Sequence, residues 1–261
     1  MKYFSLLILT VFLNACVTET SGPEPVPVNP QMALEQRVGL ARQYIGVGDW
    51  ANAKRNLELA ADIDPNSPDV LEAFALVYQR TGEFERAERS FDRALALGGG
   101  SRIRNNYAAF LFAQGRYRDS ASAFEEVTTD TLYRGRSQAF VNLGLALLQT
   151  GNVQDARASF DRGLLMEPRN ATALLELTQI ALTEGDEDAA SRYYERYRQG
   201  ARSQTARALI LGVEIARLQG DANLEASNMM VLRNLYAETP IFRAWTACLL
   251  YTSDAADDSQ C

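Results

Sequence analysis

Residues 74–98 read FALVYQRTGEFERAERSFDRALALG, and this stretch decides the fold of the chain. Apolar residues recur at helical spacing on both sides of Gly82. The small residue Ala87 follows this glycine by five residues, and the aromatic residue Phe91 follows it by nine. Small side chains let two helices approach closely, and a large aromatic side chain fills the space that is left between them. The stretch therefore predicts a helix, a tight turn at Gly82 and a second helix.

The same arrangement recurs along most of the chain. The turn glycines are Gly48, Gly82, Gly115, Gly151, Gly185 and Gly220, at intervals of 34, 33, 36, 34 and 35 residues. The small position holds Ala53, Ala87, Ser120, Ala156 and Ala190, and the large position holds Leu57, Phe91, Phe124, Phe160 and Tyr194. These are the positions of the tetratricopeptide repeat (TPR), whose units bury their apolar faces only when stacked.

We predict an all-α TPR solenoid, a right-handed superhelix of about six helix-turn-helix repeats. The sixth repeat keeps Gly220 but has Glu225 at the small position, so we interpret it as a divergent cap. The TPR domain covers residues 32–245, with repeats at 34–67, 68–100, 101–136, 137–170, 171–205 and 206–238.

The first thirty residues predict export and a tether. Residues 4–13, FSLLILTVFL, form an apolar run that is too short for a permanent membrane span and is typical of a secretory signal. The run ends in Leu13-Asn14-Ala15-Cys16, which resembles the lipobox of bacterial lipoproteins. We therefore expect a signal peptide over 1–15, lipidation at Cys16 and a Pro-rich linker over 16–31. The other interpretation is an ordinary secretory signal with Cys16 as a buried apolar residue.

Composition excludes several classes of function. The 261 residues carry a formal net charge of -7 and no basic stripe, which disfavours nucleic acid as a partner. Histidine is absent, so the commonest general base and metal ligand are missing. The sequence also has no phosphate-cradling glycine loop and no clustered metal ligands. We expect a non-enzymatic protein with no catalytic residues, no metal, no cofactor and no small-molecule substrate.

The first helix of each TPR repeat lines the concave face of the superhelix. Positions 2, 5, 9 and 12 of each repeat are expected to point inward, and several hold apolar residues that the core does not require. Such a patch marks a partner, and a groove suits a peptide segment or an amphipathic helix. Two other interpretations are that a terminal helix of the chain fills the groove, or that the face is misassigned by one residue. The predicted partner-binding residues are Val38, Ile45, Leu76, Asn105, Phe112, Val141, Leu145, Leu148, Leu175, Gln179 and Leu182.

Three segments carry a closer resemblance. They are NNYAAFLFAQGRY (residues 105–117), DTLYRGRSQAFVNLGLALLQTG (residues 130–151) and QTARALILGVEIA (residues 204–216). Together with the lipobox and the repeats, they resemble the PilF/PilW family of type IV pilus biogenesis lipoproteins. Residues 130–133, DTLY, account for the 36-residue interval. They are interpreted either as a turn that caps the next helix, with Asp130 as a local hydrogen-bond acceptor, or as a direct partner contact.

The resemblance implies a pilotin, a lipoprotein on the periplasmic face of the outer membrane that binds subunits of the pilus secretin, PilQ, and promotes their localisation and assembly. Independently of the resemblance, the expected inward position of Asn105 and Gln179 would let them hydrogen-bond a bound backbone; the other interpretation of Asn105 is a satisfied surface residue, which is common in the first helix of a TPR. The alternative is a TPR adaptor for another envelope machine, such as outer-membrane protein assembly or peptidoglycan hydrolase control.

The C-terminal segment differs from the rest of the chain. After Trp245 we expect the helical pattern to stop. Residues 248–258, CLLYTSDAADD, resemble the translation of a sequencing adapter, so residues 248–261 are interpreted as non-native. The other interpretation is a polar tail with Cys248 bridged to Cys261.

Overall fold

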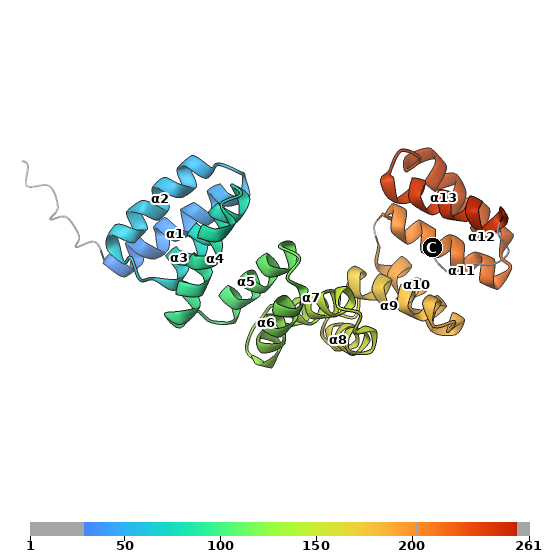
Figure 1. Ribbon diagram of the computed structural model, residues 1–261, viewed down its shortest axis with the longest axis horizontal. Helices are drawn as coiled ribbons and strands as arrows, with labels where there is room; N and C mark the ends of the chain where they lie inside the picture. Colours follow the sequence, from blue (N-terminus) through green and yellow to red (C-terminus); the bar gives the residue numbers. More distant parts are fainter. Residues whose placement is uncertain (1–28, 202, 255–261) are drawn as a thin grey trace, which may run out of the picture.

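The computed structural model describes residues 29–201 and 203–254 (Figure 1). The predictions about the signal peptide, Cys16 and Cys261 concern residues outside these ranges. The described residues form thirteen α-helices. Their bounds are α1 Pro30–Gly46, α2 Trp50–Ile63, α3 Pro68–Arg80, α4 Phe84–Ala96, α5 Ser101–Ala113, α6 Tyr117–Thr129, α7 Arg136–Gln149, α8 Val153–Met166, α9 Ala171–Thr183, α10 Glu187–Gly200, α11 Ala206–Gln219, α12 Ala222–Leu235 and α13 Pro240–Asp254.

Successive helices pair into hairpins, α1 with α2 through α11 with α12, and each hairpin packs on the next. In Figure 1 the pairs follow one another along an arc from α1 at one end to α12 and α13 at the other. The glycine of every hairpin turn, from Gly48 to Gly220, has a φ between +65° and +80°, which a residue with a Cβ atom adopts only at a cost. The prediction of an all-α TPR solenoid is confirmed.

The spine of the solenoid is built from the small and large positions of the repeat. Ala53, Ala87 and Ala156 are fully buried, and so are the large side chains Phe91 and Phe160. Ser120 takes the small position in the third repeat, where its hydroxyl donates a 2.9 Å hydrogen bond to the carbonyl of Ala108 and so stays satisfied without water. Burial of each large side chain contributes about 1.5–3 kcal/mol, so the spine supplies much of the stability.

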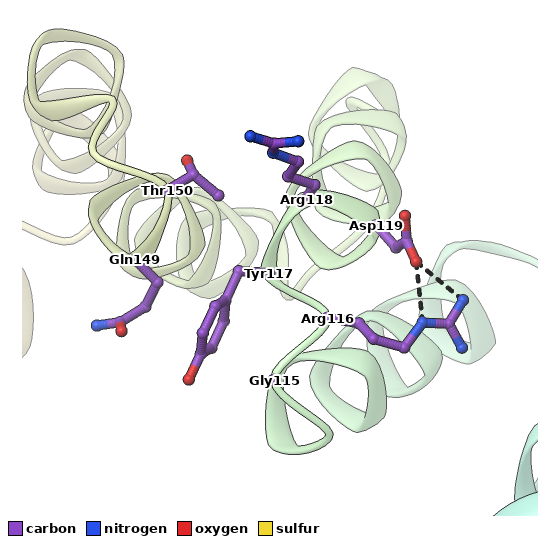
Figure 2. Close-up of a pocket in the computed structure, with 7 residues that line it drawn as sticks. All are labelled: Gly115, Arg116, Tyr117, Arg118, Asp119, Gln149 and Thr150. Atoms are coloured by element: carbon purple, nitrogen blue, oxygen red, sulfur yellow. Dashed lines mark hydrogen bonds and ion pairs between the residues drawn. The ribbon is translucent and has the colours of Figure 1, made fainter.

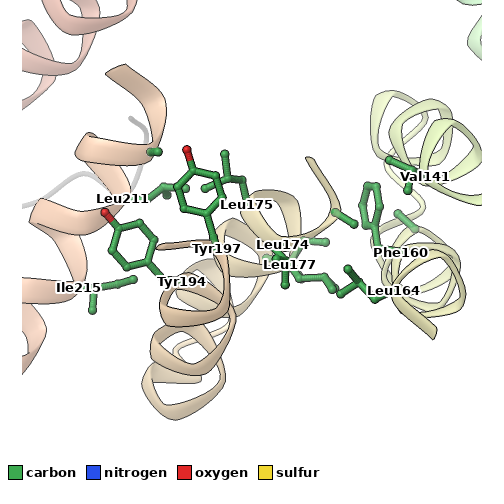
Figure 3. Close-up of a cluster of buried hydrophobic side chains, with 14 residues drawn as sticks. Val141, Phe160, Leu164, Leu174, Leu175, Leu177, Tyr194, Tyr197, Leu211 and Ile215 are labelled. Carbon is green, nitrogen blue, oxygen red and sulfur yellow. The ribbon is translucent and has the colours of Figure 1, made fainter. Parts of the chain in front are cut away.

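The apolar core is continuous between repeats. One cluster runs from α7 to α11 and includes Phe160, Leu174, Tyr197 and Leu211 (Figure 3). Each of these residues comes from a different helix, and three repeats contribute to the cluster. The largest side chains of one hairpin are thus buried partly against the next hairpin, which is why the hairpins need their neighbours.

Both ends of the helical array differ from the prediction. Helix α1 already begins at Pro30 because Asn29 caps it, accepting hydrogen bonds from the amides of Gln31 at 3.0 Å and Met32 at 3.4 Å. Pro30 and Gln31 thus belong to the helix and not to the linker. At the other end, α13 continues past Trp245 to Asp254, so the prediction that the helical pattern stops after Trp245 is wrong. Trp245 is tied to α11 by a 3.1 Å hydrogen bond to Glu214, which extends the stack beyond the sixth repeat.

No helix within the described ranges combines the length and the apolar character that crossing a membrane requires.

The spine predicts opposite effects of the same substitution at two helical glycines. A Cβ atom at Gly144 would lie 2.6 Å from the ring of the fully buried Phe160, whereas one at Gly39 would meet no atom within 4 Å. Gly144→Ala should therefore destabilise the chain by about 1–3 kcal/mol through overpacking. Gly39→Ala should stabilise it by about 0.5–1 kcal/mol through helix propensity. Urea unfolding followed by circular dichroism measures both, and equal midpoints for the two variants would contradict the packing argument.

Candidate protein-binding groove

Most first helices of neighbouring repeats contact one another. Helix α1 contacts α3, α3 contacts α5, α5 contacts α7, and α9 contacts α11. We call the surface formed by these odd-numbered helices the inner surface. It has a charged N-terminal part, an apolar centre and a second charged part.

The N-terminal part is a cluster of ion pairs around a buried carboxylate. Glu72 on α3 has a fully buried side chain and pairs with Arg42 of α1 at 2.7 Å and with Arg102 of α5. Asn106 of α5 donates a further 2.5 Å hydrogen bond to the same carboxylate. Asp69, whose side chain is 54% exposed, pairs with the same two arginines. Because a buried charge is tolerated only when it is paired, this cluster locks the first three repeats together.

The centre of the inner surface is a small apolar pocket between α5 and α7. Its volume is about 100 Å³, which admits one aliphatic side chain of a partner. Phe112 forms one wall and is held edge-on against Tyr117, with ring centroids 5.1 Å apart. The residues that line the pocket, which we call the central pocket, are Ala109, Phe112, Phe124, Asn142 and Leu145.

Amide side chains occur along the inner surface, and one of them, Asn142, lines the central pocket. Gln138 donates a 2.9 Å hydrogen bond to the Oδ1 of Asn142, which orients the Asn142 amide so that its NH₂ group is the part left to donate. The Oδ1 of Asn105 is buried and accepts no hydrogen bond from any described residue. Gln179 is exposed on α9. An extended peptide has the alternating donors and acceptors that such amides satisfy.

The predicted partner-binding residues divide into three groups. Phe112 and Leu145 line the central pocket. Gln179 is exposed, and the others that retain accessible surface are half-buried along the inner surface: Ile45, Leu76, Asn105, Leu148 and Leu182. Val38, Val141 and Leu175 are buried, with 3%, 0% and 8% of their surface exposed, so the prediction that they form surplus apolar surface is wrong.

The reason for this correction is the position of these three residues in the repeat. Position 5 of the first helix faces the second helix of the same repeat. A Cβ atom on Gly163 would lie 2.9 Å from the Val141 side chain, so Val141 fills the space that this glycine leaves. Val38 belongs to one cluster with Ala60 of α2. Leu175 packs into the same core as Tyr197 (Figure 3). Ala109 stands at one of the inward positions of the repeat without being among the predicted partner-binding residues, and sequence reasoning missed Asn142 as a pocket residue.

The second charged part is smaller. Arg207 of α11 pairs with Glu176 of α9 through both terminal nitrogens of its guanidinium group, one of them at 2.8 Å. Glu214 accepts the Trp245 hydrogen bond, and burial raises the pKa of its carboxyl group. Together with the cluster around Glu72, these pairs leave the apolar centre as the part of the inner surface that most favours an apolar ligand.

Other hollows lie away from the inner surface. One, of about 420 Å³, lies at the turns of the third and fourth repeats (Figure 2). Arg116 is held there by Asp119 at 2.9 Å, while Arg118 extends toward Thr150. A second, of about 470 Å³, lies on the side of the second helices, between α6 and α8. Within the described part of the chain, no group of acidic or cysteine side chains has the arrangement that would hold a metal ion.

The loop between α6 and α7 holds Asp130, whose carboxylate accepts hydrogen bonds from the Ser101 hydroxyl at 2.5 Å and from the Leu132 amide at 3.0 Å. The Ser101 hydrogen bond lowers the pKa of this carboxyl group. Asp130 is therefore a local acceptor, as one interpretation predicted, but Gly135 and not Asp130 is the N-cap of α7. The Leu132 side chain projects into solvent.

These features define a class of protein, a TPR solenoid whose inner surface carries a small apolar pocket. Family models described as tetratricopeptide repeat match residues 44–109 and 141–206. The type IV pilus assembly protein PilF of Pseudomonas aeruginosa is 33% identical over 88% of this chain and 92% of its own length. A solved structure of Pseudomonas aeruginosa PilF covers 84% of this chain and 98% of its own at 32% identity, with a TM-score of 0.79. A crystal structure of PilW, described as a widely conserved type IV pilus biogenesis factor, covers 84% and 100% at 25% identity, with a TM-score of 0.72.

The chain belongs to the PilF/PilW family of TPR proteins of type IV pilus biogenesis.

The ion-pair cluster predicts unequal effects of neutralising its two carboxylates. Glu72→Gln removes a buried charge that two arginines share, and should destabilise the chain by about 2 kcal/mol or more. Asp69→Asn changes an exposed group with the same partners and should cost less than about 1 kcal/mol. The midpoints of urea unfolding compare the two variants. Equal decreases of the unfolding midpoint in the two variants would show that burial of Glu72 adds nothing to the strength of the cluster.

Proposed function

We propose that the chain is a lipid-anchored scaffold on the periplasmic face of the outer membrane that binds the type IV pilus secretin. Its role would be to bring secretin subunits to the membrane and to promote their assembly into a ring. The central pocket, with the Asn142 amide in its lining, is the observation that carries the proposal, because it suits an apolar side chain on an extended segment of a partner protein.

Membership of the PilF/PilW family supports a partner within the pilus machinery. The family resemblance of the sequence implies that this partner is the secretin. The inner surface would bind one secretin segment, with an apolar side chain in the central pocket and the backbone at Asn142 and Gln179.

The mechanism we propose is binding combined with tethering. Lipid at Cys16 would hold the solenoid at the membrane, and the Pro-rich residues 17–29 would act as an extended spacer. Confinement of the groove to the membrane surface raises the effective concentration of bound secretin subunits there, and this favours their association without any chemical step.

A substitution that blocks the central pocket tests whether the secretin binds there. Ala109 is exposed at the wall of the pocket, so Ala109→Glu should put a charge at its mouth while leaving the core intact. Secretin recovered with the affinity-tagged full chain from detergent-solubilised envelopes should fall at least about tenfold, because a buried unpaired charge costs several kcal/mol.

The matched control is Ala158→Glu, which places the same charge at an exposed alanine of α8, in the hollow on the side of the second helices. Circular dichroism checks that both variants fold. Unchanged secretin recovery with Ala109→Glu would refute the proposal that the central pocket binds the secretin. Recovery of a different envelope complex by the unaltered chain would refute the secretin as the partner. It would support the alternative function, an adaptor for another envelope machine.

The anchor has its own test. Cys16→Ser should move the chain from outer-membrane fractions to the soluble periplasm, because the only proposed lipid attachment is lost. Cys248→Ser, which removes a cysteine remote from the lipobox, should leave the distribution unchanged. Fractionation of envelopes on a sucrose gradient followed by immunoblotting gives the result. A Cys16→Ser chain that stays in the membrane would exclude lipidation at this residue as the anchor.

A further inference from the structure

The most exposed large apolar side chain among the described residues is Leu132, which retains 90% of its surface. It lies at the tip of the loop that joins α6 to α7, residues 130–135. Val47 and Leu165 follow at 80% and 77%. Single exposed apolar residues are ordinary on protein surfaces, so exposure alone does not identify a contact.

Hydrogen bonds hold the loop at both ends, and this distinguishes Leu132 from an ordinary exposed residue. The Asp130 carboxylate holds the Leu132 amide and ties the loop to Ser101 at the start of α5. On the other side of the tip, the Arg136 side chain donates a 2.7 Å hydrogen bond to the carbonyl of Thr128. Leu132 is therefore presented on a backbone that is fixed at both ends, so that little conformational entropy would be lost on binding.

Tyr133 explains why Leu132 points outward. Its ring folds back over Gly135, where a Cβ atom would lie 2.7 Å from the ring and hydroxyl atoms. The ring is half-buried, and burial raises the pKa of its hydroxyl group. Since Tyr133 occupies the surface beside the loop, Leu132 has no neighbouring apolar surface to cover. The glycine two residues after the tyrosine makes this arrangement possible.

The surroundings of Leu132 are basic. Arg134 is exposed, and neither Arg134 nor Arg136 forms an ion pair with any described residue. Arg136 lies 5.4 Å from the ring of Phe140 and interacts electrostatically with the Asp130 carboxylate, whereas Arg134 is exposed. An acidic partner surface would complement the exposed guanidinium group of Arg134.

The loop lies close to the inner surface. The charges of Arg102 and Glu72, both in the ion-pair cluster, influence the pKa of the Tyr133 hydroxyl group, so Tyr133 lies near that cluster. Ser101, which holds Asp130, begins the helix that contributes Ala109 and Phe112 to the central pocket. A protein segment bound in the groove would thus pass near the loop.

We propose that Leu132 inserts into an apolar pocket, rimmed by carboxylates, on the pilus protein that also occupies the groove. The inference rests on the proposed function for the identity of that protein, the secretin. The loop would be a second, separate contact that orients the bound subunit relative to the solenoid. An isolated leucine with no apolar neighbours does not suit a membrane surface, because interfacial binding uses broad apolar faces.

The test compares two leucines of nearly equal exposure. Leu132→Ser and the control Leu165→Ser, on the outer side of α8, are introduced into the tagged full chain in cells that lack their own copy. The readouts are secretin recovered with the chain and the number of surface pili per cell. Leu132→Ser should reduce secretin recovery about tenfold or more and reduce piliation, because a leucine is no longer buried. Leu165→Ser should change neither secretin recovery nor piliation. Arg134→Glu should reduce secretin recovery, and the reduction should be largest at low salt, where charges are least screened.

The two proposals fail in different ways. If the unaltered chain recovers no secretin while Leu132→Ser alone lowers piliation, the secretin assignment fails and the Leu132 contact stands with another pilus protein. Normal recovery and piliation with Leu132→Ser would overturn the inference. A change confined to self-association of the purified chain, measured by sedimentation, would also overturn it, since the occupant would then be a second copy.

Discussion

The close approach of paired helices is the constraint on which the rest of the structure depends. At Gly144 and Phe160, which face each other from the two helices of the fourth repeat, the helices leave no room for a methyl group. Since the small and large positions of the repeat recur at an interval of about 34 residues, every hairpin takes nearly the same shape and stacks on its neighbour. The arc of the solenoid and its inner surface follow from this repetition.

The inner surface uses charge and apolar character for different purposes. At the N-terminal end, the buried Glu72 is shared by arginines from the two flanking repeats, so its ion pairs hold three hairpins in register. At the centre, small Ala109 next to Phe112 and Leu145 leaves a hollow instead of a contact. The ion pairs that stiffen the scaffold and the proposed binding pocket thus lie on different parts of one surface, so the proposed partner could occupy the centre without disturbing those pairs.

For a tethered scaffold, rigidity has a functional value. A groove that keeps its shape loses little entropy on binding, and a loop beside it that is held at both ends adds a second fixed point. Two contacts on one stiff frame define the orientation of a bound subunit, whereas one contact would leave it free to rotate. Orientation of neighbouring subunits at a membrane is a requirement for closing a ring, which links the geometry of the groove and loop to the proposed role in secretin assembly.

The sequence by itself determined the repeat, the turn glycines and the helix pairing, because these depend on local spacing that recurs in every unit. It also located Phe112 and Leu145 on the inner surface. Only the tertiary structure decided which inward positions remain accessible. Val141 is buried because Gly163, on the other helix of its hairpin, makes room for it, and Leu175 is buried in the core cluster that it shares with Tyr197 of α10. Burial depends on neighbours that are distant along the chain, and for this reason the periodicity of one helix could not reveal it.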